Sequence, residues 1–202
     1  HTVLATFSKN MGADALVPAN YALSGSGKGS LAAMPEDVVQ VDGANYRLIW
    51  SCPALMRRGG NITIAVAGIV KDYAGNPMVA PFARTHFGGA MAALPVITLL
   101  GSNPDTYECG GAYVDPGATA VDACGTDISG SVVAASVPGT STIIYSVTDA
   151  AGNSAVSLVR TVNAVDTTPP DITLVGDVSV TVECGDVYTD AGATALDTCS
   201  GD

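Results

Sequence analysis

Short runs of alternating hydrophobic and polar residues recur along the first half of the chain. Alternation of this kind is typical of β-strands that bury one face. Two of the runs are joined through Asp42-Gly43, a dipeptide that favours a tight β-hairpin. The runs predicted as strands lie at residues 2–7, 37–41, 46–50 and 61–70. Several short strands at this spacing predict an antiparallel β-sandwich.

The second half of the chain continues the pattern and adds a clear hairpin. Residues 142–147 and 156–162 alternate, and the turn between them is Thr148–Asn153 (TDAAGN). Another strand is predicted to begin at Pro95. Gly (23 residues) and Pro (11) are frequent, which also favours short strands joined by turns. No apolar stretch approaches the roughly 18 residues that a membrane-spanning helix needs, so membrane insertion is not expected.

An ungapped repeat is the most informative feature of the sequence. Residues 95–127 return at 170–202, and 18 of 33 positions are identical. A repeat of this length indicates a tandem array of small domains rather than a solenoid of short units. The second copy stops at Asp202, less than halfway through its repeat. We expect either a segment of a longer array or a subunit whose last domain is completed by another molecule.

The net charge of −11 is unevenly distributed. Residues 1–91 carry seven Lys or Arg against five acids, whereas residues 92–202 carry one base, Arg160, against fourteen acids. The acidic half would repel a phosphate backbone, which argues against nucleic-acid binding. Surface acids can simply keep the protein soluble. Alternatively, a mildly basic head meets an acidic tail in a head-to-tail assembly of copies of the chain.

The five cysteines indicate an oxidising compartment. Cys109 and Cys124 lie in the first copy of the repeat, and Cys184 and Cys199 occupy the same positions in the second. Neither pair has the spacing of a zinc site, so we predict two local disulfides, Cys109–Cys124 and Cys184–Cys199. Disulfides persist outside the reducing cytosol, and the chain is therefore expected to be secreted or held at the cell surface. Cys52 is left over and is predicted to be a buried free thiol, with an intermolecular disulfide as the alternative.

The element Asp-x-x-Gly-Asn occurs twice and is interpreted as a hairpin turn. An Asp carboxylate can accept hydrogen bonds from amides in the turn, and Gly or Asn tolerates a tight reversal. The residues are Asp72, Gly75 and Asn76, and then Asp149, Gly152 and Asn153. Calcium binding is the alternative, since carboxylates and loop carbonyls are its natural ligands. The weak calcium candidates are Asp115, Asp122, Asp127, Asp166 and Asp171. No other cofactor is expected.

Catalysis is not expected from this sequence. Glu108 and Asp122 flank the cysteines of the first copy, and Glu183 and Asp197 flank those of the second. Paired carboxylates can support acid–base chemistry. However, an active site repeated in every spacer repeat, without a nearby histidine, is implausible.

Several stretches of the first segment resemble the bacterial Ig-like domains of S-layer and other surface proteins. The matching pieces are ATFSKNM (5–11), NYALSG (20–25), YRLIW (46–50), ITIAVAGIVKD (62–72) and AGNPM (74–78). The family usually has a proline-rich strand before the FSK-like stretch. Nothing precedes His1 to supply it, so this sandwich is expected to lack its first strand.

The repeats resemble hyalin-repeat domains and related bacterial Ig-like domains of tandem surface proteins. The matching positions are the turn Asp115–Ala118 and the Y-x-V-x-D-x-x-G-N pattern, with Tyr145, Asp149, Gly152 and Asn153. This resemblance covers residues 95–202 and implies a small β-sandwich used as a spacer or interaction module.

Together, these observations predict an all-β chain of tandem Ig-like antiparallel β-sandwiches, the last one incomplete. The predicted domains are 1–91, which lacks its first strand, 92–165, with one disulfide, and 166–202, a linker and the first half of a second repeat. The expected function is a non-enzymatic part of an extracellular filament, rod or surface layer, assembled head-to-tail with strand complementation. The alternative from another class is an adhesin or spacer of a larger secreted protein that presents loops to a surface receptor.

Overall fold

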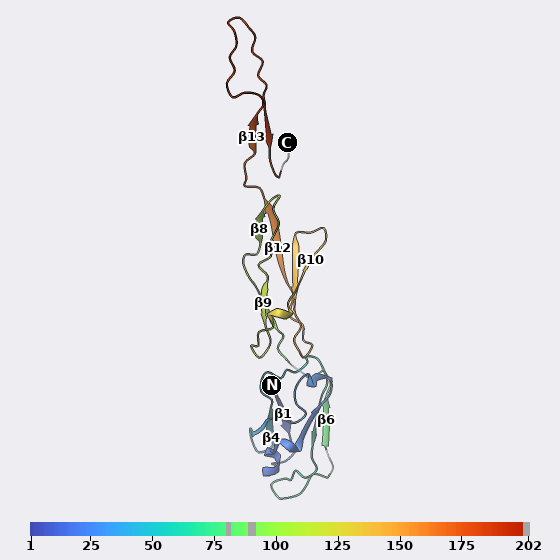
Figure 1. Ribbon diagram of the computed structural model, residues 1–202. Helices are drawn as coiled ribbons and strands as arrows, with labels where there is room; N and C mark the ends of the chain where they lie inside the picture. Colours follow the sequence, from blue (N-terminus) through green and yellow to red (C-terminus); the bar gives the residue numbers. More distant parts are fainter. Residues whose placement is uncertain (80–81, 89–91, 200–202) are drawn as a thin grey trace.

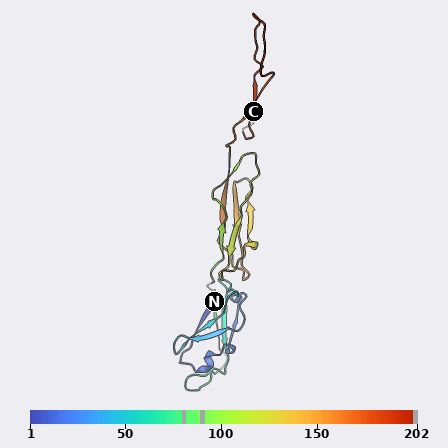
Figure 2. The same ribbon diagram turned by 60° about the vertical axis from the view of Figure 1, so that its left-hand side comes forward.

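The computed structural model describes residues 1–79, 82–88 and 92–199 of the chain. Its described residues form three parts that lie in single file, and the molecule is elongated in both views (Figures 1 and 2). The regular structure consists of strands and four short 3-10 turns, without an α-helix among the described residues. Within that part of the chain, none of the helical segments has the length and apolar character needed to cross a bilayer.

The first sandwich consists of two three-stranded sheets with the orders β1-β4-β3 and β2-β5-β6. Every pair in these sheets is antiparallel. Its strands are β1 (Thr2–Thr6), β2 (Tyr21–Ser24), β3 (Asp37–Gln40), β4 (Asn45–Ile49), β5 (Ile62–Val66) and β6 (Phe82–His86). Its 3-10 turns are η1 (Ala13–Leu16), η2 (Pro18–Asn20) and η3 (Ser26–Lys28). Strands β3 and β4 form the hairpin that Asp42-Gly43 predicted.

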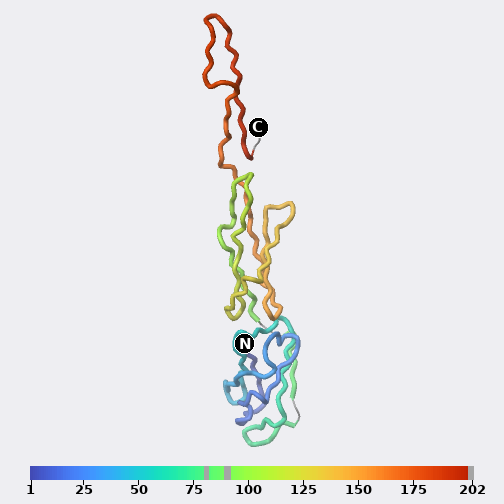
Figure 3. Tube along the Cα trace, viewed as in Figure 1, coloured from blue at the N-terminus to red at the C-terminus, as the bar shows by residue number. Residues whose placement is uncertain are grey.

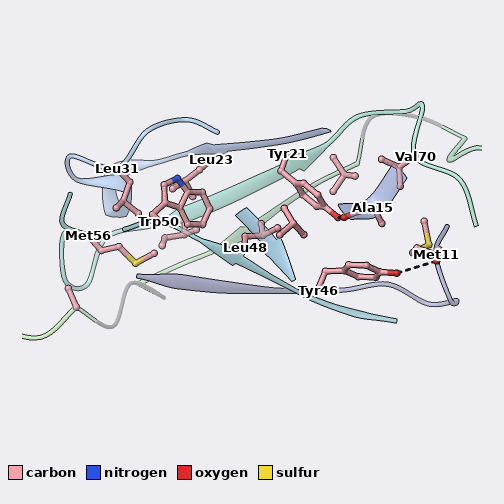
Figure 4. Close-up of a cluster of buried hydrophobic side chains, with 14 residues drawn as sticks. Met11, Ala15, Tyr21, Leu23, Leu31, Tyr46, Leu48, Trp50, Met56 and Val70 are labelled. Carbon is pink, nitrogen blue, oxygen red and sulfur yellow. Dashed lines mark hydrogen bonds between the residues drawn. The ribbon is translucent and has the colours of Figure 1, made fainter. Parts of the chain in front are cut away.

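The alternation along β4 builds the core of the first sandwich. Tyr46 and Leu48 are buried between the sheets, whereas Arg47 between them is exposed. Trp50 follows on the same face, and its indole Nε1 donates to the carbonyl of Ala32 at 3.0 Å. The Tyr46 hydroxyl donates to the carbonyl of Met11 at 3.2 Å, so both aromatic polar atoms are satisfied (Figure 4).

The second sandwich combines a four-stranded sheet, β10-β11-β12-β8, with the pair β7-β9. One pair departs from the expected antiparallel arrangement, because β8 runs parallel to β12. Its strands are β7 (Val96–Leu99), β8 (Asp105–Glu108), β9 (Ala118–Val121), β10 (Val133–Ser136), β11 (Thr142–Ser146) and β12 (Leu158–Val165), with the 3-10 turn η4 (Ser129–Ser131). Its core includes Ile97, Tyr145, Val147 and Val162.

The third part is a long distal hairpin, residues 171–199. Its two strands, β13 (Asp171–Leu174) and β14 (Ala193–Leu196), pair antiparallel. Every residue of both strands is exposed, and no buried cluster forms there among the described residues. Figure 3 shows the long connection between these strands as a loop that points away from the rest of the molecule.

Two expectations change in detail. The apolar run 61–70 was predicted as one strand, but β5 ends at Val66 because the chain reverses there, with the amide of Val70 donating to the carbonyl of Ala67 at 3.2 Å. The predicted domain boundaries at residues 91 and 202 lie outside the described residues.

A buried arginine organises the second sandwich. Arg160 of β12 has 0% exposure, and its guanidinium donates to three carbonyls, those of Leu100, Ser102 and Gly117. It also lies 3.2 Å from Asp105 and donates to the hydroxyl of Tyr145 at 3.1 Å. A fully buried charge is tolerated only when it is paired and hydrogen-bonded in this way.

Replacing Arg160 with Met is therefore expected to lower the free energy of unfolding of the second sandwich by about 3 kcal/mol, because the partners are left buried and unpaired. Urea unfolding followed by circular dichroism measures this. Arg47→Met is the matched control, since Arg47 is exposed on β4, and it should change stability by no more than about 0.5 kcal/mol. Equal effects of the two changes would contradict the structural role of Arg160.

Candidate functional site

The candidate site consists of the two junctions between the three parts. The first junction joins the two sandwiches, and the second joins the second sandwich to the distal hairpin. The first junction uses the turn of the second Asp-x-x-Gly-Asn element. Asp149 Oδ1 accepts hydrogen bonds from the amides of Ala151 (2.9 Å) and Asn153 (2.8 Å), and Gly152 takes a φ of 84°. Positive φ is strained for a residue with a side chain, so the glycine is required at this point of the turn. The turn places the Asn153 side chain at the tip of the second sandwich.

Asn153 bridges the two sandwiches. Its Nδ2 donates to the carbonyl of Met56 at 2.8 Å, and its Oδ1 accepts from the amide of Arg58 at 2.6 Å. Asn153 is 3% exposed and Met56 is 5% exposed, so these bonds are largely shielded from water. The Arg58 guanidinium adds a bond to the carbonyl of Ala92 at 3.0 Å. Buried, satisfied polar contacts of this kind fix a relative orientation as well as adding stability.

The first element forms the same turn, but it packs against residues of its own sandwich, where the amide of Tyr73 donates to the carbonyl of Asn10 at 3.1 Å. Asp72 Oδ1 accepts from the amides of Ala74 (3.0 Å) and Asn76 (2.9 Å), and Gly75 has a φ of 85°. Asn76 is exposed. The two turns therefore share their internal hydrogen bonds and differ in what the asparagine side chain contacts.

The disulfides cross the junctions, which corrects the pairing predicted from spacing. The structure bonds Cys52 to Cys124 and Cys109 to Cys199, over sequence separations of 72 and 90 residues. Cys184 is free and exposed. The predicted bonds Cys109–Cys124 and Cys184–Cys199 are thus not formed, because the two cysteines of one repeat lie toward opposite neighbours. In both bonds, the second cysteine of a repeat joins a cysteine of the preceding part.

Cys52 was predicted to be a buried free thiol, and this was wrong. It is exposed at the edge of the first junction, where Cys124 reaches it from the loop after β9. The apolar sequence neighbours of Cys52 favour burial, but its partner sulfur belongs to the second sandwich, which is 72 residues away in sequence.

Glu108 fastens the linker at the second junction. Its carboxylate accepts four hydrogen bonds of 2.7 to 3.0 Å from the amides and hydroxyls of Thr167 and Thr168. These bonds, led by the Thr167 amide, lower the pKa of Glu108 from 4.5 to about 2. Sequence reasoning placed Glu108 beside Asp122 as a carboxylate pair, because it assumed the local disulfide. Cys109 is bonded to Cys199 instead, and Glu108 binds Thr167 and Thr168 of the linker.

The acids proposed for calcium are distributed among separate turns. Asp122 accepts from the amides of Cys124 and Thr126, and Asp127 accepts from Ser129. Asp115 accepts from Gly117 and Tyr145, and burial together with this second bond raises the pKa of Tyr145 to about 12. Asp171 lies exposed on β13.

One group of potential metal ligands exists among the described residues, and it does not have the character of a calcium site. Glu108, Asp166 and Cys199 have ligand atoms within 4.8 Å of one another. The Cys199 sulfur is bonded to Cys109, however, and both Glu108 oxygens already accept from the linker. Glu108 thus accepts hydrogen bonds from the linker, while Asp115, Asp122 and Asp127 accept them within turns of the second sandwich.

A groove on the first sandwich is the remaining feature of the site. It has a volume of about 1000 Å³ and lies between β1 and β6, the edge strands of the two facing sheets. All of β1 lines it, together with alternate residues of β5 and β6, including Ile64, Val66, Phe82 and Arg84.

The second sandwich matches a known protein family. Residues 97–164 match the family model described as bacterial surface protein, Ig-like domain. Over these residues the second sandwich is similar to bacterial surface Ig-like domains. The family match agrees with the resemblance inferred from the repeat, the cysteines and the hairpin turn. No curated protein matches the sequence.

Three solved structures of one bacterial S-layer protein, SbsC, show a distant likeness. Its N-terminal part is 18% identical with a TM-score of 0.35, covering 80% of this chain and 41% of that one. The structure of rSbsC(31-844) is 16% identical with a TM-score of 0.35, covering 90% of this chain and 27% of that one. Domains 1–6 of SbsC give 16% identity and a TM-score of 0.34, covering 96% of this chain and 30% of that one. The chain spans less than half of each, and a likeness of this size carries no argument about function.

Replacing Asn153 of the Ig-like domain with Ala is expected to lower the free energy of unfolding by about 1–3 kcal/mol, since the buried Met56 carbonyl loses its donor. Asn76→Ala is the matched control. It breaks the same turn where no second sandwich is bound, and should cost no more than about 0.5 kcal/mol. Urea unfolding monitored through Trp50 fluorescence compares the two. Equal losses would show that Asn153 acts only within its own turn.

Replacing Glu108 with Gln should loosen the linker that follows the Ig-like domain. The pKa of Glu108 is lowered in the folded state, so its contribution is fully present above pH 4.5 and is lost as the pH falls toward about 2. The protection of the Thr167 and Thr168 amides from hydrogen exchange, measured relative to the intrinsic exchange rate at each pH, should decrease over that interval in the native chain. In Glu108→Gln, exchange should be fast already at neutral pH.

Glu183→Gln is the control for this change, because Glu183 is the equivalent residue of the second copy and is exposed. It should leave the exchange of Thr167 and Thr168 unaltered. Native-like protection in Glu108→Gln would show that the linker is held by other contacts.

Proposed function

We propose that this chain is a non-enzymatic structural segment of an extracellular bacterial surface layer, rod or filament, built to hold successive domains in a stiff line. The observation that carries the proposal is the first junction, where a buried asparagine and a disulfide join two sandwiches at separate points. Two separated attachments oppose hinge motion, whereas a single flexible linker would allow it.

The second junction follows the same plan with different residues. Glu108 holds Thr167 and Thr168 of the linker, and the Cys109–Cys199 disulfide crosses to the distal hairpin. Pro169 and Pro170 follow at once and restrict the backbone to extended conformations. A chain built for catalysis or for capturing a ligand does not need such attachments at every junction. A chain that transmits force or sets a spacing does.

The bacterial surface Ig-like match supports the location, and the cross-junction disulfides agree with it. Disulfides survive on the cell surface and in the extracellular space. The acidic second half keeps such an exposed rod soluble, and its opposition to the mildly basic first half favours head-to-tail contact between copies of the chain. We therefore propose self-association along the rod axis.

Small-angle X-ray scattering of the dilute chain tests the stiffness on which this function depends. The oxidised protein should scatter as an extended, rigid rod, with a maximum dimension close to that of the structure. The triple variant Cys52→Ser, Cys124→Ser, Asn153→Ala removes both attachments of the first junction and should scatter as two bodies joined by a flexible link. A flexible native profile, equal to that of the variant, would overturn the proposal.

A further inference from the structure

Strand β10 is an open edge in the middle of the molecule. It is the outermost strand of the four-stranded sheet of the second sandwich, and among the described strands only β11 pairs with it. It runs along one side of the molecule, in line with the long axis (Figures 1 and 2). All four of its residues are exposed. An uncovered edge of this kind offers its backbone groups to another strand.

The hydrogen bonds of the β10–β11 hairpin show which backbone groups face outward. The amide of Val137 donates to the carbonyl of Thr142 at 3.1 Å, which makes these two residues a hydrogen-bonded pair. Because bonded and non-bonded pairs alternate along an antiparallel ladder, Ala135 also bonds to β11, whereas Ala134 and Ser136 direct their amides and carbonyls to the open side. On that side, neither residue has a backbone partner within the described part of the chain.

The β10 edge carries no charge that would repel another strand. Residues 128–148, which contain β10, β11 and the turn between them, include no Asp, Glu, Lys, Arg or His. Charged side chains commonly protect edge strands, and other edges of this molecule have them: Asp37 on β3, Arg84 on β6 and Glu108 on β8. The edge of β2 is covered instead, since the amide of Leu23 donates to the carbonyl of Ala33. Strand β10 has neither form of protection.

The side chains of the edge are complementary to a second copy of the same strand. Val133, Ala135 and Val137 form an apolar row on the outer face of the sheet, since Ala135 lies opposite Ile144, which is 38% exposed. The row is symmetric about Ala135 and ends at Pro138, which has no amide to continue a ladder. A strand with the same row in the opposite direction matches it apolar against apolar.

The distribution of charge favours an antiparallel arrangement of the two copies. Residues 166–202 carry acids and no base, whereas residues 1–91 carry seven Lys or Arg against five acids. Two rods that pair antiparallel through their second sandwiches place the acidic segment of each beside the first sandwich of the other. Parallel rods would place acid beside acid. Backbone bonding and charge therefore favour the same arrangement.

We infer that two copies of this chain associate side by side by pairing β10 with β10 antiparallel, with Ala135 on the two-fold axis. The amide and carbonyl of Ala134 in each copy bond to those of Ser136 in the other, and each Val133 lies opposite Val137 of the other strand. The two four-stranded sheets then form one continuous sheet. The inference rests on the proposed structural function, and it adds a lateral contact that is distinct from contact along the rod axis.

The contact is isologous, so it closes as a dimer. One short edge strand makes a small interface, and the dimer is therefore weak in dilute solution. In a surface layer the neighbouring rods are held at a high local concentration, and a weak lateral contact becomes effective there.

Sedimentation velocity over a concentration series that extends to about 1 mM tests the contact. All proteins carry Cys184→Ser, so that the free thiol does not form adventitious dimers. The parent should dimerise reversibly. Ala135→Glu should weaken this association at least about 10-fold, because it places two carboxylates directly opposite one another. Ser146→Glu is the matched control, with the same charge on the exposed face of β11, and should associate like the parent.

A parent that stays monomeric at the highest concentration would overturn the inference. So would an Ala135→Glu variant that associates like Ser146→Glu. Both side chains are exposed in the single molecule, so the two variants should unfold at the same temperature, and thermal unfolding followed by circular dichroism checks that both are folded.

Cross-linking tests the register in the same Cys184→Ser background. On the two-fold axis, Ala135 forms a non-hydrogen-bonded pair with itself, with Cα atoms about 4.5 Å apart, which is within reach of a disulfide. Ala135→Cys should therefore give a covalent dimer rapidly under mild oxidation. Ile144→Cys is the control. It places a thiol on the same exposed face, but three strand spacings, about 14 Å, separate the two copies of it. Equal yields from the two variants would contradict the pairing of β10 with itself.

The pairing and the structural function can fail separately. A chain that scatters as a stiff rod when dilute yet never dimerises would contradict the lateral pairing and leave the proposed function standing. A chain that dimerises through Ala135 but scatters as flexible bodies would do the opposite.

Discussion

The edges of the small sheets are the constraint from which the rest of the structure follows. A sandwich of six short strands has a small core and leaves backbone groups unpaired along its outer strands. The second sandwich satisfies one such edge internally, by laying β8 parallel to β12. In the first sandwich, the outer edge of β6 pairs with no strand among the described residues. Sandwiches with cores this small gain stability from contacts with a neighbouring part.

The same dependence explains the construction of the junctions. Polar contacts between domains are weak when water competes for them, and they gain strength when a neighbouring surface excludes it. Asn153 is buried by the first sandwich and so bonds to Met56 and Arg58, whereas the exposed Asn76 amide donates to Asp72 within its own turn. A single turn motif thus works as a local reversal or as an attachment, and burial decides which. The disulfides add a covalent link beside these contacts.

Much of the fold was predictable, because strands and turns depend on nearby residues. Alternation located β1, β3, β4, β11 and β12, and Asp42-Gly43 located a hairpin. Even buried Arg160 could have been found, since it shares the inward face of its strand with Leu158 and Val162. The disulfides could not, because the equal spacing of the cysteines in the two copies says nothing about which end of a sandwich each sulfur reaches. Cys124 meets the sandwich before it and Cys109 meets the hairpin after it.

The difference between the predictable strands and the unpredictable disulfides has a physical basis, and the same basis bears on the function. The residues that make one sandwich are correlated in sequence with period two, and that period is visible without a structure. The residues that join two sandwiches come from loops at opposite ends of each domain. Their partners are remote in sequence, so no local pattern shows which residues pair. Cys109 bonds to the part that follows its repeat, and Cys124 bonds to the part that precedes it. Equivalent positions of the repeat therefore indicate which neighbour each cysteine contacts. The first copy is bonded both to the part before it and to the part after it, as a member of a linear array must be.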